Sequence, residues 1–442
     1  MKIAIVGCGL AGMSAYLAFL KFLPGDHEVI IYEWRSPQPS EDPLTKHLDS
    51  SQAVAPQGGA IGISANGMRV LRKLDPAVHR TMQERGFFYE TLRLRSSSGW
   101  DLSVVSRRQR ADDVTMIMAR QIAWQALREA IPDAHVVTKK AIKVIRRGQS
   151  GNSKPVIIFA DGDSKEFDLV VGADGVHSTV RKQIFSDKGL DCSAVFSQRC
   201  GIWGFMPMPI PKEVAETKSV VIVLGHCASM GYSAYRPTKD DSLTWWSLYE
   251  TKEPPSQKEV PREFVPTLLQ EMCGHWEEEN VQKVLRKASA PFVYPIWTVP
   301  ELPTWGDGGV VLVGDAAHAM TPDIGQGTSQ AFEDSEALGM FLGCALQKSN
   351  ISDDDAVDLA VKGLYESRQP RLSKIKLLNA QAQSKGVKRN IWAQRLMFFC
   401  IWIMPKLAWL RNIVYGGGHK TDEILYGWDV EEETRKVVER SD

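Results

Sequence analysis

Two aspartates in this 442-residue chain each follow an apolar run and a glycine-containing turn. Asp315 comes directly after Val310 to Val313 and Gly314, and Asp174 comes after the apolar run from Asp168 to Val171. Apolar β-branched runs of this length are typical of strands buried on both faces. Since open α/β sheets bind ligands at the carboxyl ends of their strands, both carboxylates are expected at a ligand-binding edge.

The segment after Asp315 predicts a site for a delocalised anion. Pro322 and two glycines keep this segment irregular until a helix begins near Thr328. That helix would direct free backbone N–H groups and the positive end of its dipole toward a ligand beside Asp315, which suits an electron-rich, delocalised anion such as a reduced flavin ring. The cofactor-binding candidates here are Gly325, Gln326, Gly327 and Thr328. The alternative is an ordinary strand, loop and helix with a buried aspartate.

A glycine-rich loop near the N-terminus predicts dinucleotide binding. GCGLAG follows a strand from Lys2 to Val6 and opens an apolar helix, and Glu33 ends a second strand about 20 residues further on. The glycines suit a tight turn, a close approach of backbone to pyrophosphate, and close packing of helix on strand, while the glutamate suits a ribose. The candidates from this motif are Gly7, Gly9, Leu10, Ala11, Gly12 and Glu33. Cys8 lies inside the loop and is interpreted as filler, because the loop works through its backbone.

Two further residues are cofactor-binding candidates. Gly62 lies in a strand from Gly58 to Ile63 that is crowded with glycine, as if a flat ligand lay against its backbone. Arg120 begins a helix, where the dipole disfavours a cation, so a phosphate or flavin is a reasonable partner. The alternative for Arg120 is an ordinary surface position.

Composition narrows the class of protein. Lys plus Arg (53) balances Asp plus Glu (53), so no overall field attracts nucleic acid or an anionic membrane. The seven cysteines show no paired spacing, which argues for a reducing compartment and against a structural metal. The N-terminus shows no secretory signal, so we expect a cytoplasmic protein that is soluble or peripherally attached to a membrane.

The motifs together resemble the single-component flavin-dependent aromatic hydroxylases typified by para-hydroxybenzoate hydroxylase and salicylate hydroxylase. Three fingerprints carry the resemblance: GCGLAG, then DLVVGADGVHSTVR from Asp168, then VGDAAHAMTPDIGQGTSQAFED from Val313. It extends from Lys2 to about Arg371, where YESRQPR is similar to the family's final helix. The resemblance implies that FAD is the cofactor, with NADPH or NADH as a transient co-substrate.

By the same resemblance, Glu33 and Arg120 would hold the adenosine and phosphate half of FAD, and Asp315 would hold the ribityl chain. Gly325 to Thr328 would contact the isoalloxazine, and Asp174 would serve both FAD and the nicotinamide. The implied fold is α/β, with a Rossmann-like FAD-binding domain, a mixed-sheet substrate domain and a C-terminal helical region. The expected boundaries are 1–75, 116–190 and 300–371 for FAD binding, 76–115 and 191–299 for the substrate domain, and 372–442 for the C-terminal helices.

The segment from Phe196 to Val299 is expected to select the substrate. It predicts four strands, at 201–205, 219–224, 231–235 and 243–249, and a covering helix from Glu263 to Cys273. Any single aromatic here is more often core than contact, because half of each strand faces inward. The substrate candidates are Trp203, His226, Tyr232 and Trp246.

Three residues are assigned to catalysis: Arg199, Tyr235 and Pro322. Tyr235 matches a family position beside the flavin. Many phenol-hydroxylating relatives have an arginine directly before the glycine aligned with Gly201, whereas this chain has Cys200 there and Arg199 one place earlier. A shift of one residue on a strand reverses the face of a side chain. Either the register differs and Arg199 still serves, or the substrate is not an ionised phenol.

The C-terminal segment from Trp392 to Leu410 is strongly apolar, but Pro405 and Lys406 divide it below the ~20 residues needed to span a bilayer. It is interpreted as helices packed over the substrate domain, or as a surface that touches a membrane or a second subunit. The glycines from Gly416 form a turn, and 430–442 predicts a solvated helix.

These patterns predict an FAD- and NAD(P)H-dependent monooxygenase. It would insert one oxygen atom of O2, through a flavin C4a-hydroperoxide, into a hydrophobic aromatic, indolic or polyketide-like molecule. The site must stay dry, because water promotes collapse of that intermediate to hydrogen peroxide. A flavin oxidase, or a non-redox flavin-binding module or cyclase of the same fold, is the alternative. The protein is expected to be a monomer or homodimer.

Overall fold

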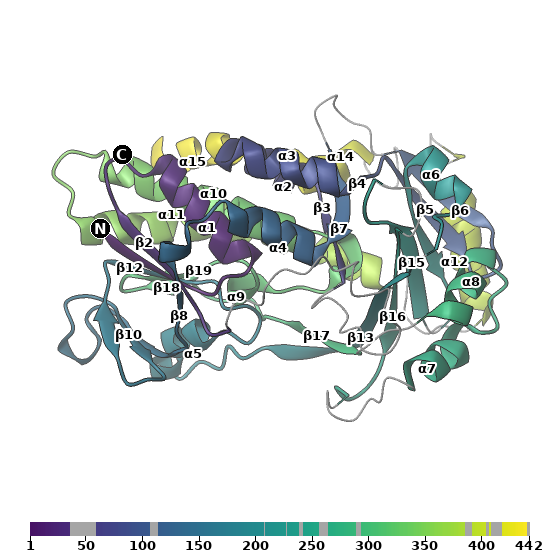
Figure 1. The fold of residues 1–442 in the computed structure, drawn as a ribbon, viewed down its shortest axis with the longest axis horizontal. Helices are drawn as coiled ribbons and strands as arrows, with labels where there is room; N and C mark the ends of the chain where they lie inside the picture. Colours follow the sequence, from purple (N-terminus) through teal and green to yellow (C-terminus); the bar gives the residue numbers. More distant parts are fainter. Residues whose placement is uncertain are drawn as a thin grey trace.

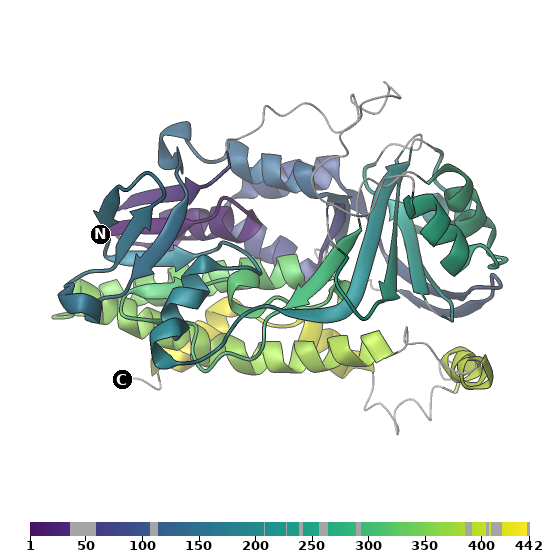
Figure 2. The same ribbon diagram turned by 90° about the horizontal axis from the view of Figure 1, so that it is seen from below.

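The fold is organised around two large sheets that lie side by side along the molecule (Figures 1 and 2). The structure is a computed structural model, and it describes residues 1–35, 59–106, 114–206, 208–226, 228–237, 242–255, 264–288, 293–384, 391–403, 406–407 and 418–439. The surface excursion predicted for 36–57 therefore lies outside the described residues.

The first sheet has six strands in the order β18-β19-β12-β1-β2-β8. β1 pairs in parallel with β2 and β12, β12 pairs in parallel with β19, and only β18 runs antiparallel to its neighbour. The strands are β1 (Lys2–Val6), β2 (Glu28–Glu33), β8 (Val136–Thr138), β12 (Leu169–Gly172), β18 (Gly306–Asp307) and β19 (Val310–Leu312). β12 and β19 are buried along their whole length, which explains their continuous apolar sequences.

Helices α1 (Leu10–Phe22), α10 (Gly327–Leu346) and α11 (Asp353–Ser384) cover this sheet (Figure 1). α10 is buried on almost all sides, since α1 packs on one side of it and α11 on another. Ser14 of α1 and Ser335 of α10 share a buried hydrogen bond of 2.7 Å between their hydroxyls. α11 continues through the predicted domain boundary after Arg371.

The second sheet has seven strands in the order β17-β13-β16-β15-β14-β5-β6. All neighbours are antiparallel except β14 and β5, so the sheet is mixed. The strands are β5 (Thr91–Ser96), β6 (Asp101–Ser106), β13 (Val195–Met206), β14 (Ser219–Leu224), β15 (Ala228–Ala234), β16 (Leu243–Glu250) and β17 (Tyr294–Thr298). The four predicted strands correspond to β13, β14, β15 and β16. The predicted α/β fold with a mixed second sheet is confirmed.

One face of the seven-stranded sheet is covered by α6 (Lys212–Thr217), α7 (Phe264–Cys273) and α8 (Glu279–Lys287), which lie on the outer side of the molecule in Figure 1. Cys200, Ile202, Tyr232 and Trp245 point into this layer and are fully buried. The predicted covering helix is α7, and its first predicted residue, Glu263, lies outside the described residues. The other face is turned toward the first sheet.

Two three-stranded sheets and several helices complete the fold. A three-stranded sheet contains β3 (Ala60–Ile63), β7 (Met116–Ala119) and β4 (Phe87–Phe88), and another contains β9 (Ala141–Ile145), β10 (Val156–Phe159) and β11 (Ser164–Glu166). The remaining helices nearby are α2 (Ala65–Leu74), α3 (Pro76–Arg85), α4 (Arg120–Glu129), α5 (Thr179–Phe185) and α9 (Asp315–His318).

The C-terminal region contains α12 (Ile391–Ile403), α14 (Gly418–Tyr426) and α15 (Val430–Glu439). The predicted helix over 430–442 exists as α15, but the expectation that it is solvated is wrong on one side. Val430 and Thr434 are buried, because α15 packs against α10 and α11.

A buried carboxyl group lies beneath this C-terminal region. Glu336 of α10 is 1% exposed, and its partner is Lys73 of α2, whose Nζ lies 3.2 Å from Glu336 Oε1. Lys73 also lies 3.8 Å from Asp429 and from Glu431. Burial raises the pKa of Glu336 to about 7, although Lys73 acts to lower it.

This shift predicts a pH-dependent stability. Between the ordinary pKa of Glu336 and about 7, the folded chain binds a proton that the unfolded chain has released, so stability falls as pH rises through that window. We expect Glu336→Gln to raise the unfolding free energy by roughly 1–3 kcal/mol at pH 8 and to have little effect at pH 5. Urea unfolding at both pH values, with the half-exposed Glu366→Gln as control, measures this difference. Equal effects of Glu336→Gln at both pH values would contradict it.

Candidate active site

The first glycine loop lies directly against the loop that contains Asp174. Gly7 has φ of 110°, and a Cβ at this position would lie 2.5 Å from the Ala173 carbonyl oxygen. A Cβ at Gly12 would lie 2.0 Å from the Gly7 carbonyl oxygen, so helix α1 can approach the loop only with glycine there. The N–H of Gly7 donates to the carbonyl of Tyr32, which brings the end of β2 to the same place.

The third fingerprint reaches the same edge through Gly314. This residue has φ of 59°, and a Cβ there would lie 2.9 Å from the Cβ of Ala11 and 3.1 Å from that of Ala331. Its N–H donates to Asp334 Oδ2 at 2.9 Å. The turn before Asp315 is therefore wedged between α1 and α10. All three motifs meet at the carboxyl edge of the six-stranded sheet.

A buried charge network lies behind this turn. Asp334 accepts hydrogen bonds from His318 Nε2 at 2.5 Å and from Arg368 Nε at 2.8 Å, and Glu333 accepts from Arg371 Nε at 2.8 Å and from Asn66 Nδ2 at 2.7 Å. Burial alone would raise the pKa of Asp334, but His318 and Arg368 hold it below its usual value. The network fixes α10 against α2, α9 and α11. Sequence reasoning did not assign it.

Glu33 is directed at the glycine loop. Its Oε2 accepts from the backbone N–H of Cys8 at 2.9 Å and its Oε1 from the N–H of Arg35 at 3.0 Å. The carboxylate therefore lies beside the loop, where a ribose is predicted. Burial and the Glu33 charge raise the pKa of the Cys8 thiol to about 11. A thiol with so high a pKa is a poor nucleophile, in line with the interpretation of Cys8 as filler.

Asp315 and Asp174 present their carboxylates differently. Asp315 is exposed although the residues on both sides of it are buried, and no hydrogen bond or ion pair involves its side chain within the described part of the chain. Asp174 instead caps α5: one oxygen accepts from Ser178 Oγ at 2.5 Å and the other from the N–H of Thr179 at 2.7 Å. Asp315 is thus available to ligand hydroxyl groups, whereas Asp174 mainly shapes its own loop.

The backbone at the start of α10 is open to a ligand and lies at the positive end of the helix dipole. Gly325 has φ of 64°, and a Cβ at Gly325 or at Gly327 would meet no atom within 4 Å. The first turn of α10, which contains the half-buried Thr328, carries no acidic residue to offset the helix dipole. The side chain of Gln326 is buried and bonds to Ser64 Oγ at 3.2 Å. It supports the loop from behind, so that the backbone faces outward.

Gly62 and Arg120 complete this edge. A Cβ at Gly62 would lie 3.8 Å from the Gly325 carbonyl oxygen, so β3 runs beside the loop before α10. Arg120 begins α4 with an exposed side chain, and its N–H donates to the Gly59 carbonyl at 3.1 Å. Gly9, like Gly325 and Gly327, has open space where a Cβ would point.

These features fit an FAD molecule. Three open glycines allow a ligand to approach the backbone closely, and Glu33 and Asp315 provide acceptors for ribose and ribityl hydroxyls. Arg120 and the helix start at Gly9 suit phosphates. Leu10 and Ala11 contribute backbone in the first turn of α1 and pack inward. The roles of individual residues remain predictions.

The face of the seven-stranded sheet that is turned toward this edge is aromatic. Trp203 stacks on Tyr294 with ring centroids 4.4 Å apart, and a Cβ at Gly59 would lie 2.2 Å from its ring. Trp246 pairs with Trp203 across the two strands. The ring centroids of Tyr235 and Phe205 lie 4.5 Å apart, and Tyr235 also packs with residues of β7. We call Trp203, Phe205, Tyr235, Trp246 and Tyr294 the aromatic face.

Two substrate candidates do not belong to this face. Tyr232 points into the opposite, helix-covered layer, where its hydroxyl bonds to Glu213 at 2.9 Å and to Glu278 at 3.0 Å beside Arg95. His226 lies in the turn between β14 and β15 and not on a strand. Strand alternation explains the difference, because Tyr235 is three residues after Tyr232 and so faces the other way.

Arg199 reaches the segment before α10. Its NH1 donates to Asp323 Oδ1 at 2.6 Å, and both side chains are at least nine-tenths buried. Gln198 has φ of 58° within an irregularity in the pairing of β13 with β17, whereas the pairing of β13 with β16 is regular from Arg199 to Met206. By strand alternation with Ile202, Cys200 points into the helix-covered layer. Arg199 lies beside η5 (Pro322–Ile324), whose first residue, Pro322, is exposed.

Arg181 is a second buried residue whose structural role the sequence did not predict. Its buried guanidinium donates to the carbonyl oxygens of Ala316 and Cys192, each at 2.8 Å, and of Val176 at 2.5 Å. It therefore links the Asp174 loop to α9. The only sequence signal is its position at the end of the second fingerprint.

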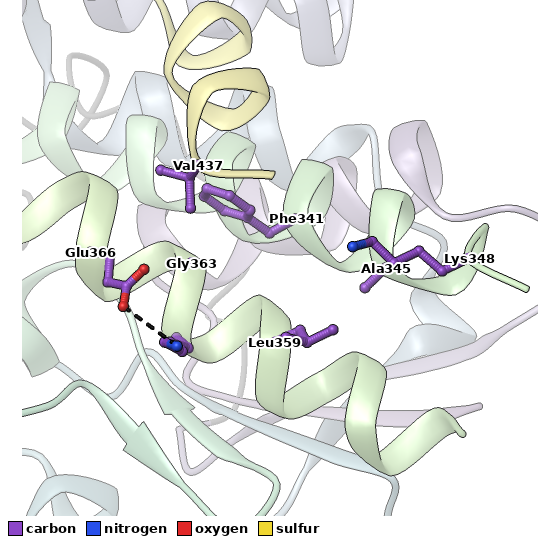
Figure 3. Close-up of a pocket in the computed structure, with 8 residues that line it drawn as sticks. Phe341, Ala345, Lys348, Leu359, Gly363, Glu366 and Val437 are labelled. Carbon is purple, nitrogen blue, oxygen red and sulfur yellow. Dashed lines mark ion pairs between the residues drawn. The ribbon is translucent and has the colours of Figure 1, made fainter. Parts of the chain in front are cut away.

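The hollow drawn in Figure 3 is separate from this site. Phe341, Leu359, Gly363 and Val437 line it, between the distal part of α10, α11 and α15. Phe341 lies roughly 20 Å along α10 from Gly327, at 1.5 Å per residue. The hollow therefore has no part in the candidate cofactor site.

Comparison with known proteins supports the cofactor prediction. The sequence matches the family model described as FAD binding domain over residues 51–353. It is 26% identical to chloroplastic zeaxanthin epoxidase of an Oncidium hybrid cultivar over 388 residues, 85% of this chain and 53% of the relative. It is also 26% identical to FAD-dependent monooxygenase ctvC of Aspergillus terreus over 405 residues, 85% of this chain and 77% of the relative. This chain thus spans about half the length of the zeaxanthin epoxidase.

The fold is similar to that of a solved salicylate hydroxylase substrate complex, with a TM-score of 0.73 and 16% identity over 99% of this chain and 98% of that one. The predicted resemblance to the flavin-dependent hydroxylases and the predicted FAD cofactor are confirmed.

The position of Asp315 predicts a specific loss. Asp315→Ala should leave the chain folded and weaken FAD binding by about 10–100-fold, because hydrogen bonds from ligand hydroxyls to a carboxylate are worth roughly 1.5–3 kcal/mol. Flavin fluorescence titration of the apoprotein measures the affinity, with the exposed Asp26→Ala as control. Unchanged affinity in Asp315→Ala would remove this residue from the site.

Proposed function

The chain belongs to the FAD-binding domain family, and we propose that it is a monooxygenase that uses NADPH or NADH and O2 to hydroxylate or epoxidise a neutral, hydrophobic, electron-rich small molecule. The observation that carries the proposal is the aromatic face, which is turned toward the edge where the three glycine-containing loops meet. Two relatives are named as an epoxidase and a monooxygenase, which agrees with it.

In this proposal the chain divides the cofactor among separate elements. Glu33 and Arg120 hold the adenosine and phosphates, Asp315 holds the ribityl hydroxyls, and the amides from Gly325 to Thr328 donate to the electron-rich edge of the flavin ring. When bound, FAD supplies oxidation of the nicotinamide and activation of O2.

The aromatic face provides a dry reaction space. Trp203 and Tyr294 stack with an interplanar angle of 7°, which forms a flat apolar surface, and Tyr235 is 2% exposed. Aromatic rings exclude water and contact a planar substrate over a large area. Excluding water favours oxygen transfer over release of hydrogen peroxide.

The Arg199–Asp323 pair favours a neutral substrate over an anionic one. Arg199 is already compensated by a carboxylate 2.6 Å away, so this buried pair carries no net charge with which to attract an anion. Asp323 Oδ2 and Trp203 Nε1 are buried and have no hydrogen-bond partner among the described residues. One polar group on an otherwise apolar substrate could bond to either atom.

The direct test is a turnover screen of the purified protein. We expect bound oxidised flavin, slow NAD(P)H oxidation without substrate, and oxidation stimulated at least about tenfold by neutral aromatic, indolic or alkene-containing molecules, with an oxygenated product detected by mass spectrometry. Absence of flavin after reconstitution would overturn the proposal. Flavin without any NAD(P)H oxidation would favour an oxidase or a non-redox flavin-binding module.

The buried ion pair gives a second test. Arg199→Met leaves Asp323 charged and unpaired, so we expect product formed per NAD(P)H consumed to fall by about tenfold or more while hydrogen peroxide rises. The double variant Arg199→Met/Asp323→Asn removes both charges and should recover part of this coupling.

The exposed Arg286→Met serves as control and should couple like the unmodified chain. If Arg199→Met keeps full coupling, the pair has no role in positioning substrate. A loss of flavin content in parallel with coupling would indicate a purely structural role instead.

A further inference from the structure

Helix α12 exposes a row of large apolar side chains. Trp392, Leu396 and Phe399 are 71%, 64% and 55% exposed, and their spacing places them on one side of the helix. Trp402 continues the row at 37% exposure. We call these four residues the α12 patch. Gln394 is buried, and α12 packs on β6, the edge strand of the seven-stranded sheet.

The strand beneath α12 adds to the exposed apolar surface. Trp100, in the turn before β6, is 73% exposed, and Val104 and Val105 of β6 are each nearly half exposed. Large exposed apolar side chains on two neighbouring elements are uncommon on soluble monomers and can mark a site of interaction. α12 thus packs on the edge strand of the substrate-domain sheet and leaves an apolar side exposed to solvent.

The charged residues in the sequence segment that contains α12 are all basic. Between Glu366 and Asp422 the sequence contains no Asp or Glu, and from Lys385 onward it contains the basic residues Lys385, Lys388, Arg389, Arg395, Lys406, Arg411 and Lys420. Two of these cations lie against the patch: Lys406 Nζ is 3.3 Å from the ring centroid of Trp402, and the Arg395 guanidinium is 5.5 Å from that of Trp392. Tryptophan and phenylalanine beside lysine and arginine are typical of helices that lie at a membrane surface.

We propose that α12 is a peripheral anchor that lies in the plane of a bilayer containing anionic lipid. Trp392, Leu396 and Phe399 would insert at the boundary of headgroups and acyl chains, and Arg395 and Lys406 would contact lipid phosphates. At 1.5 Å per residue, 13 residues cover about 20 Å, which is less than the ~30 Å hydrocarbon core. Within the part of the chain that the structure describes, no helix has the length and apolarity to cross a bilayer.

The charge pattern favours a lipid surface over a second copy of this chain. A symmetric dimer through the α12 patch would bring Arg395 and Lys406 of both copies together. The segment supplies no carboxylate to pair with them, so like charges would repel at the contact. An anionic lipid surface supplies the missing negative charge.

The test is vesicle flotation of the full-length FAD-loaded protein. We expect binding to vesicles of 70% phosphatidylcholine and 30% phosphatidylglycerol to be at least about tenfold tighter than to pure phosphatidylcholine, since each basic residue near an anionic surface contributes about 1 kcal/mol. Trp392→Ser/Leu396→Ser/Phe399→Ser should weaken binding to the anionic vesicles at least about tenfold. Arg395→Glu/Lys406→Glu should abolish the preference for anionic lipid.

Matched controls keep the same chemistry away from α12. Leu20→Ser/Leu359→Ser/Leu377→Ser changes three exposed leucines, and Lys283→Glu/Lys362→Glu reverses two exposed lysines, and both should bind like the unmodified chain. Flavin content confirms that each variant is folded.

Three outcomes would overturn the proposal. These are a failure of the unmodified protein to float with anionic vesicles, binding of the triple α12 variant as tight as that of the unmodified chain, and conversion of a dimer to a monomer by the triple variant without any vesicle binding. The last result would identify the patch as a subunit interface. Because binding is measured without turnover, this test is independent of the proposed reaction.

Discussion

The cofactor edge of this protein depends on the buried carboxylate of Asp334. That group accepts the Gly314 N–H at 2.9 Å and is compensated by His318 and Arg368. Asp315 follows the turn that Asp334 holds, and Gly325 to Thr328 span the start of α10, the helix on which Asp334 lies. One carboxylate therefore sets the distance between the two parts of the flavin site. Since an unpaired buried charge costs several kcal/mol, this geometry also depends on Arg368, which α11 supplies from a distant part of the sequence.

Glycine positions made much of the cofactor edge predictable from the sequence. At Gly7, Gly12 and Gly314 a neighbouring backbone or side-chain atom leaves no room for a Cβ. The glycines of these motifs therefore follow from local steric requirements, which the sequence reveals directly. The buried strands were also predictable, because each is a continuous apolar run in the sequence. Arg368 and Asn66 could not be assigned in this way, because their partners are separated from them in sequence and no local pattern marks a buried ion pair.

In the substrate domain, residue types alone did not predict which side chains face the cofactor edge. From the sequence alone, Tyr232 and Tyr235 are equally good substrate candidates. In the structure, Tyr232 bonds to a glutamate under the helices, whereas Tyr235 lies beside β7. The face on which each side chain lies depends on the pairing of β13, β15 and β16 and on the helices that cover the sheet. Both depend on residues that are far apart in the sequence. Arg199 is a similar case. It bonds to Asp323, a partner far away in the sequence that the residue types do not reveal, and Gln198 beside it takes a positive φ where the pairing of β13 with β17 is irregular.

The proposed reaction site and the proposed membrane anchor lie at opposite ends of the second sheet. The sheet runs from β17 and β13, which carry Trp203, Arg199 and Tyr294, across to β6, on which α12 packs. Five strand spacings of about 4.8 Å place β13 about 24 Å from β6. A bilayer held by the α12 patch would therefore contact the substrate domain at its outer edge, too far away to change the surroundings of the flavin. Its effect would be on the delivery of a hydrophobic molecule, whereas Arg199, Asp323 and the aromatic face would act on the reaction itself.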